Sequence, residues 1–197
     1  TVVLYGDSYN EFAALVYWTL KYYRHRDVRL LNGGKYYWTE NGYPTTERRP
    51  SVPEVDYEPQ QPNDRIRAFR GDVQDGLAED VTFVDVRSAE EYRGEADSPG
   101  RADGHVPGSA NVEWTSVVRE CGRFEHPQAL KRPFAEAGIE EDDDVVLYCD
   151  VGERSALVWF ALSELLGYPS VANYDGSWSE WGNLVDVPVE RSVADNP

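Results

Sequence analysis

The feature that most constrains the fold is an apolar segment that runs through a charged loop into a second apolar segment. Residues 145–148 (Val-Val-Leu-Tyr) form a short, largely β-branched run, which predicts a buried strand. Residues 156–166 carry apolar side chains at helical spacing, which predicts an amphipathic helix. The loop between them opens with Cys149, so we expect a thiol at the junction of a strand and a helix.

A thiol at such a junction faces the N–H groups of the turn and of the helix N-terminus. These groups favour the thiolate, so we expect the pKa of Cys149 to fall below the free value of about 8.5. Gly152 lets the loop curl so that several N–H groups point at one anion. The alternative is a small core residue, but Asp150, Glu153 and Arg154 make the surroundings too charged for a core.

The spacing within the loop favours a small bound group. Four residues separate Cys149 from Arg154, one fewer than in the phosphate-binding loop of cysteine phosphatases. A sulfur atom already bonded to the cysteine would fit this smaller loop. Arg154 and Ser155 lie where a substrate anion would sit.

Residues 149–155 (Cys-Asp-Val-Gly-Glu-Arg-Ser) resemble the active-site loop of the rhodanese (thiosulfate sulfurtransferase) family. Residues 84–92, 104–112 and 174–181 resemble three other signatures of that family, in the same order. The resemblance implies an α/β fold, a rhodanese-like domain with a central parallel β-sheet flanked by helices. The similarity is greatest to two-domain thiosulfate sulfurtransferases whose loop contains Gly-Glu-Arg-Ser.

The resemblance also implies the chemistry. Cys149 would accept sulfur from a small anionic donor such as thiosulfate and hand it, as a persulfide, to cyanide or a thiol acceptor, without cofactor or metal. His105 would be structural, because a thiolate formed in advance needs no general base. The predicted substrate-binding residues are Arg87, Val151, Gly152, Glu153, Arg154 and Ser155, with Asp85 and Asp150 in supporting roles.

One residue departs from the family pattern. Arg usually follows the cysteine in this subgroup, but Asp150 stands there. A carboxylate beside the nucleophile should raise its pKa and repel a dianionic donor. Three alternatives therefore stay open: a sulfurtransferase for 3-mercaptopyruvate or a protein persulfide, a catalytically silent binding module, and a phosphatase or arsenate reductase.

The beginning of the chain repeats this central stretch. A shift of 149 − 6 = 143 residues places Gly6 on Cys149, and it aligns some forty residues without a gap. The same shift carries Asp7, Ala13, Val28, Gly33 and Trp38 onto Asp150, Ala156, Val171, Gly176 and Trp181. Because Gly6 has no side chain, the first copy should be inactive.

We therefore interpret residues 1–48 as the second half of a degenerate rhodanese-like domain. Residues 49–64 form a Pro-rich linker, and residues 65–197 form the catalytic domain. We expect the chain to be a fragment or one piece of a cleaved protein. The half-domain would expose apolar surface, and it would stay docked on the catalytic domain or meet its missing half on another chain.

Other elements follow from local patterns. Ser88 and Glu91 form a capping box, which predicts a helix from residue 89. Helical patterns are also present at residues 71–79, 112–118 and 127–137, a short strand is predicted at 66–69, and a long polar loop at 95–107. We expect the tail after Val187 to fray.

The composition excludes some partners. The chain has 36 acidic and 19 basic residues, for a net charge of −17, which argues against nucleic acid and anionic membranes. Cys121 and Cys149 are too few for a disulfide framework, and no membrane span or signal peptide is evident, so we expect a cytoplasmic protein. Only three lysines accompany this acidity, which suggests adaptation to high salt.

The salt hypothesis predicts that molar KCl stabilises the fold, because salt screens the repulsion among the acidic side chains. Thermal unfolding followed by circular dichroism should give a higher midpoint in molar KCl than in dilute buffer. Equal midpoints would contradict the hypothesis.

Overall fold

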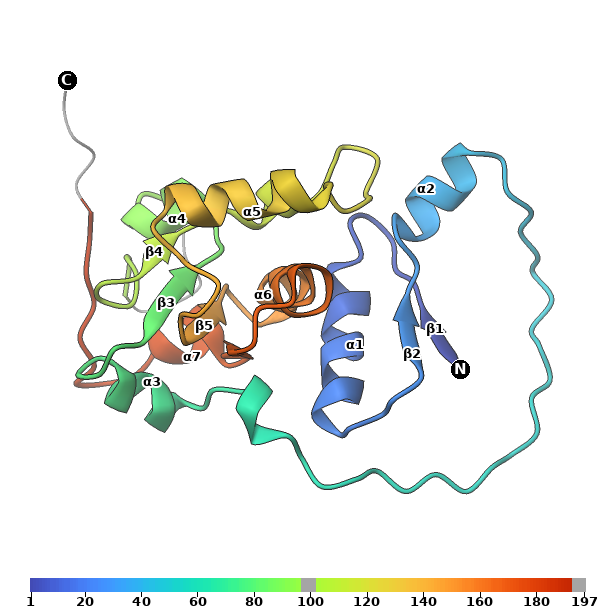
Figure 1. Cartoon of the computed structure of the whole chain (residues 1–197), viewed down its shortest axis with the longest axis horizontal. Coiled ribbons are helices and arrows are strands. Elements are labelled where there is room, and N and C mark those ends of the chain that lie inside the picture. Colours follow the sequence, from blue (N-terminus) through green and yellow to red (C-terminus); the bar gives the residue numbers. More distant parts are fainter. Residues whose placement is uncertain (97–101, 193–197) are drawn as a thin grey trace.

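A computed structural model describes residues 1–96 and 102–192. Its larger sheet has four parallel strands in the order β4-β3-β5-β6, formed by β3 (Thr82–Asp85), β4 (Ala110–Asn111), β5 (Val145–Tyr148) and β6 (Val171–Asn173). Five α-helices lie in the same part of the chain: α3 (Arg70–Gly76), α4 (Ala89–Arg93), α5 (Pro127–Glu136), α6 (Glu153–Trp159) and α7 (Ser177–Trp181). This arrangement is the α/β fold with a parallel sheet and flanking helices that the sequence predicted (Figure 1).

The first forty residues form a smaller unit with its own two-stranded parallel sheet. It consists of β1 (Val2–Leu4), α1 (Glu11–Tyr22), β2 (Val28–Leu30) and α2 (Gly34–Glu40). Val2 pairs with Val28, and Val145 pairs with Val171, so the two strand pairs have the same register under the shift of 143 residues. That this unit is half of a degenerate domain stays a prediction.

Helix α1 docks the smaller unit on the larger one by packing against α6 (Figure 1). Trp18 is buried and donates its indole N–H to the carbonyl of Ile66, 2.9 Å away. Tyr17 packs edge-on against Phe160, which begins the π-helical extension of α6 (Phe160–Leu166). Buried apolar side chains from both units therefore belong to one core cluster.

The segment that joins the two units is extended. Residues 44–60 are exposed and lie in no helix or strand, as the proline content predicted (Figure 1). The chain regains structure in a 3₁₀ turn at Asp64–Ile66, and Arg67 then forms an isolated parallel bridge with Asn173 of β6. The strand predicted at 66–69 is thus reduced to a single bridge.

Most predicted helices are present, and one is wrong. Helices α3, α4 and α5 match the predicted segments, and the capping box of Ser88 and Glu91 is formed. Residues 112–118 contain only a 3₁₀ turn at Trp114–Val117, and the preceding strand β4 was not predicted, because two residues show no periodicity. Gly100, in the predicted polar loop, and residues 193–197 lie outside the described residues. Residues 188–192 do not fray as expected, because Glu190 forms an antiparallel bridge with His105 and Arg191 binds Asp103. Among the described helices, none combines the length and apolarity that a membrane crossing requires.

If both units share one core, truncating Trp18 to alanine should destabilise the whole chain. Removing a buried indole typically costs about 3–5 kcal/mol. Urea denaturation of Trp18→Ala should give one transition at lower urea, whether helix content or tryptophan fluorescence is followed.

Phe12→Ala is the matched control, because Phe12 lies on the same helix but is 68% exposed. It should change the free energy of unfolding by no more than about 0.5 kcal/mol. Two separate transitions in the wild type would contradict the single core.

Candidate active site

Cys149 lies directly after β5, at the carboxyl edge of the parallel sheet, where open α/β sheets place their sites. The chain turns back at Gly152 and enters α6 one residue later. Gly152 has a φ of +94°, and a Cβ at this position would lie 2.9 Å from the Cα and the carbonyl oxygen of Asp175. Only glycine therefore fits this turn without displacing the neighbouring segment.

Two residues of the loop donate hydrogen bonds to the sulfur. The N–H of Gly152 points at Sγ over 3.1 Å, and the hydroxyl of Ser155 lies 3.5 Å from it. A second hydroxyl, that of Ser177, is 4.0 Å away, but it donates to the carbonyl of Tyr174 and accepts the N–H of Cys149. The structure thus brings Gly152 and Ser155 to the nucleophile, while the side chain of Val151 is exposed.

The expected lowering of the thiol pKa is wrong for this arrangement. Cys149 is fully buried, and burial is the main cause that raises its pKa. The negative charge of Glu153 raises it further, and the hydrogen bonds of Ser155 and the charge of Arg154 oppose this only in part. The resting group at neutral pH is therefore the thiol.

The carboxylate that acts on the thiol also differs from the expected one. Asp150 turns away and accepts a hydrogen bond from the hydroxyl of Ser179 at 3.1 Å. Glu153 instead places Oε2 3.7 Å from Sγ, where it accepts the S–H. The effect that we assigned to Asp150 therefore belongs to Glu153.

Arg154 is held beside the loop by two carboxylates. It forms a bidentate pair with Glu91 of α4, at 2.9 and 3.1 Å, and its Nε lies 3.6 Å from Glu153 Oε1. This pair keeps the pKa of Glu91 below its usual value, although burial alone would raise it. A donor anion at Arg154 would compete with these partners.

Arg87, which we expected to bind the substrate, has other partners in the structure. It is 1% exposed, and its guanidinium binds both oxygens of Asp85 and the carbonyl of Gly104. It also stacks over the ring of Trp178, with its central carbon 4.5 Å from the ring centroid. This geometry does not support a role for Arg87 in donor binding.

Asp85 and His105 have mainly structural contacts. Asp85 accepts the main-chain N–H of Arg87 as well as its side chain, so it stabilises the turn after β3. His105 is buried, stacks on Tyr92 and lies 2.7 Å from the carbonyl of that residue, in agreement with the structural role expected for it.

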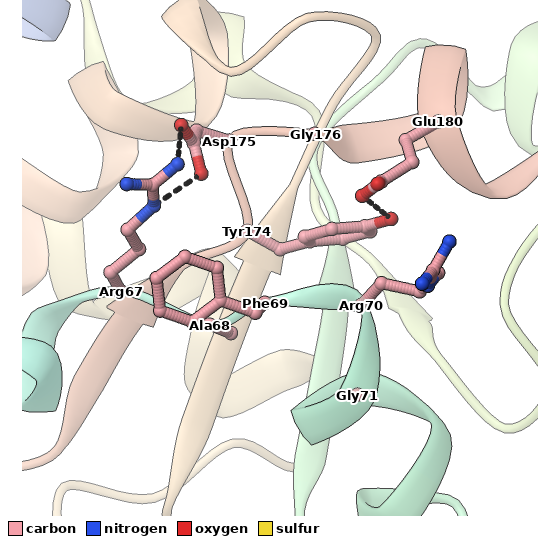
Figure 2. A pocket seen from close by; sticks show the side chains of 9 residues that line it. All are labelled: Arg67, Ala68, Phe69, Arg70, Gly71, Tyr174, Asp175, Gly176 and Glu180. Atoms are coloured by element: carbon pink, nitrogen blue, oxygen red, sulfur yellow. Dashed lines mark hydrogen bonds and ion pairs between the residues drawn. The ribbon is translucent and has the colours of Figure 1, made fainter.

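A polar cavity of about 510 Å³ is lined by residues 67–71, residues 174–176 and Glu180, and it adjoins the loop through Asp175 (Figure 2). Asp175 links the two, because its main chain touches Gly152 and its carboxylate binds Arg67 through two 2.9 Å hydrogen bonds. Across the cavity, the hydroxyl of Tyr174 donates to Glu180 at 2.6 Å, close to the side chain of Arg70 (Figure 2).

Several of these contacts were not predicted. The capping box predicted a role for Glu91 at the start of α4, but it did not predict the pairing of Glu91 with Arg154. In the sequence, Ser177 and Asp175 are only parts of a family signature, and their contacts were not predicted. Glu11 of α1 also faces the loop: burial and then the charge of Glu153 raise its pKa. Nothing in the local sequence around Glu11 indicates this, because helix docking creates the contact.

A buried cysteine on a glycine-bent loop at the edge of a parallel sheet defines a cysteine-dependent α/β domain. Residues 70–184 match the Rhodanese-like domain family. The chain is 50% identical, over 97% of its length and 69% of the relative's, to a Haloferax volcanii protein named provisionally as a thiosulfate sulfurtransferase. It is 46% identical, over 97% of its length and 71% of the relative's, to the sulfur carrier protein TtuD of Thermus thermophilus. The chain belongs to the rhodanese family, and these relatives support sulfur transfer as its general chemistry.

Solved structures share the fold across both units. The chain superimposes with a TM-score of 0.86 and 27% identity on EanB carrying a cysteine persulfide, in a tetrahedral intermediate state with ergothioneine. The match covers 98% of this chain and 52% of that one, so the chain spans about half the length of this structure.

The raised pKa of Cys149 predicts slow alkylation at neutral pH. In a Cys121→Ala background, the iodoacetamide rate should increase with pH and reach its midpoint above the free-cysteine value of about 8.5, because the buried thiol ionises late. The same chain unfolded in urea is the control and should show the ordinary midpoint. A folded-state midpoint well below 8.5 would instead indicate a stabilised thiolate.

Proposed function

We propose that the chain moves a sulfane sulfur from a small donor to a thiophilic acceptor through a persulfide on Cys149. The observation that supports this most directly is the 3.1 Å contact between Sγ and the N–H of Gly152, at the carboxyl edge of the sheet. A main-chain N–H in this position stabilises negative charge on the sulfur once the thiol has lost its proton.

The reaction is a double displacement. Sγ, once deprotonated, attacks the outer sulfur of a thiosulfate or persulfide donor, the donor's S–S bond breaks, and its electron pair leaves with the inner sulfur, as sulfite if the donor is thiosulfate. With 3-mercaptopyruvate the C–S bond breaks instead, and the electron pair leaves as the enolate of pyruvate. Cyanide or a thiolate then attacks the outer sulfur of the Cys149 persulfide and releases the Cys149 thiolate. Ping-pong kinetics should result.

Thiosulfate is the donor that the sequence favours, but the charges around the thiol support a second candidate. Arg87 is paired with Asp85, and Arg154 is paired with Glu91. Glu153 adds a negative charge 3.7 Å from the sulfur. A dianion meets more repulsion here than a monoanion does, so a low-molecular-weight or protein persulfide, or 3-mercaptopyruvate, is the alternative donor. Comparing kcat/KM for thiosulfate, 3-mercaptopyruvate and cysteine persulfide distinguishes them.

A further partner is proposed for the smaller unit. Val3, Tyr5, Phe12 and Val16 are exposed apolar side chains on β1, α1 and the loop between them. A cavity of about 470 Å³ lies beside β1, with Tyr5 and Trp38 among its lining residues. A half-domain on another chain would cover this surface and extend the two-stranded sheet.

Replacing Cys149 distinguishes an active enzyme from a catalytically silent binding module. Cys149→Ala should abolish thiocyanate formation from thiosulfate and cyanide, because Cys149 is the thiol on the loop and receives the N–H of Gly152. After incubation with donor, mass spectrometry should find one added sulfur atom on the peptide that contains Cys149.

Cys121→Ala serves as the control and should retain turnover, because Cys121 lies in a separate turn. Thiocyanate formation by Cys149→Ala would contradict the assignment. An unmodified Cys149 with every donor would favour the silent module.

A further inference from the structure

The carboxylate of Glu153 is the acceptor that the structure places on the thiol of Cys149. Its Oε2 lies 3.7 Å from Sγ, in the direction of an S–H hydrogen bond. Its side chain is 14% exposed, and it begins α6 directly after the glycine turn. The loop and the helix therefore fix this carboxylate beside the reacting atom.

A nucleophile in this environment must lose a proton during the reaction. Burial and the charge of Glu153 keep Cys149 as a thiol, whereas the thiolate is the species that attacks sulfur. The other side chains near Sγ are hydroxyls, and that of Ser177 is already bonded to Tyr174 and to the N–H of Cys149. His105 is bonded at Tyr92 instead.

We propose that Glu153 is a catalytic residue that takes the Cys149 proton during attack and returns it to the departing group. This proposal rests on the proposed sulfur transfer. The S–H bond breaks as the bond from Sγ to the donor's outer sulfur forms. The electron pair of the donor's S–S bond leaves with its inner sulfur, and Glu153 protonates that thiolate or sulfite. No oxidant, reductant or cofactor is needed for this balance.

The charged groups around Glu153 fit this role. Arg154 Nε lies 3.6 Å from its Oε1, and Glu91 shares the same guanidinium. The charge of Glu153 also acts on Glu11 of α1, on the docked unit. Arg154 thus contacts two carboxylates, those of Glu91 and Glu153, and a proton taken up by Glu153 lowers the net negative charge around the guanidinium.

The two possible roles of Glu153 predict opposite changes in the turnover of Glu153→Gln. Loss of the negative charge should shift the alkylation midpoint of Cys149 to lower pH, in the Cys121→Ala background. If Glu153 only opposes ionisation, turnover at neutral pH should then increase. If it transfers the proton, kcat/KM at neutral pH should fall by about 100-fold or more, which is the usual size of general acid–base effects.

The pH profile gives a second signature. The activity of Glu153→Gln should increase with pH as the thiolate forms without a base, and it should approach that of the wild type in alkaline solution. Glu11→Gln is the matched control, because it removes a neighbouring charge without touching the sulfur. It should lower the alkylation midpoint slightly and cause no loss of turnover.

Glu153→Asp covers the case in which the glutamine variant does not fold. It keeps the charge at a longer distance, so it should reduce kcat/KM while leaving the alkylation midpoint near that of the wild type. Unchanged or faster turnover in either folded variant would overturn the role of Glu153. If the wild type itself transfers no sulfur from any donor, the proposed function fails, and the two failures are therefore distinguishable.

Discussion

The close approach of Gly152 to the main chain of Asp175 determines the shape of the loop that begins at Cys149. The left-handed turn at Gly152 directs its N–H at Sγ and starts α6 at Glu153. A side chain at this position would collide with backbone rather than with a movable side chain, so the turn could not relax cheaply. The position of the sulfur, of its hydrogen-bond donor and of the carboxylate beside it all follow from this one contact.

The electrostatics of the loop differ from those of a preformed thiolate site. Its peptide dipoles favour negative charge, but full burial and the nearby Glu153 outweigh them. Arg154, whose positive charge acts on the thiol, is already paired with Glu91. A protonated sulfur protected from solvent resists unwanted oxidation, and it needs a partner that can release it for reaction.

Local patterns in the sequence predicted the parts of the fold that local chemistry decides. The strand and helix around Cys149, the capping box at Ser88 and the register of the repeated strand pair all have short-range signals. The pKa of Cys149 and the partner of Arg87 could not be predicted, because each depends on tertiary burial. The direction of Asp150 depends on Ser179, twenty-nine residues later in the chain.

The ion pair between Arg67 and Asp175 joins the segment that follows the extended linker to the residue packed against Gly152. Arg67 also bridges to Asn173, so the segment that leaves the linker adheres to the edge of β6. Peeling this segment from the sheet would free Asp175, the residue against which Gly152 is bent. The residue that opens the larger unit thereby helps to hold the backbone against which the cysteine loop bends, more than a hundred residues further along the chain.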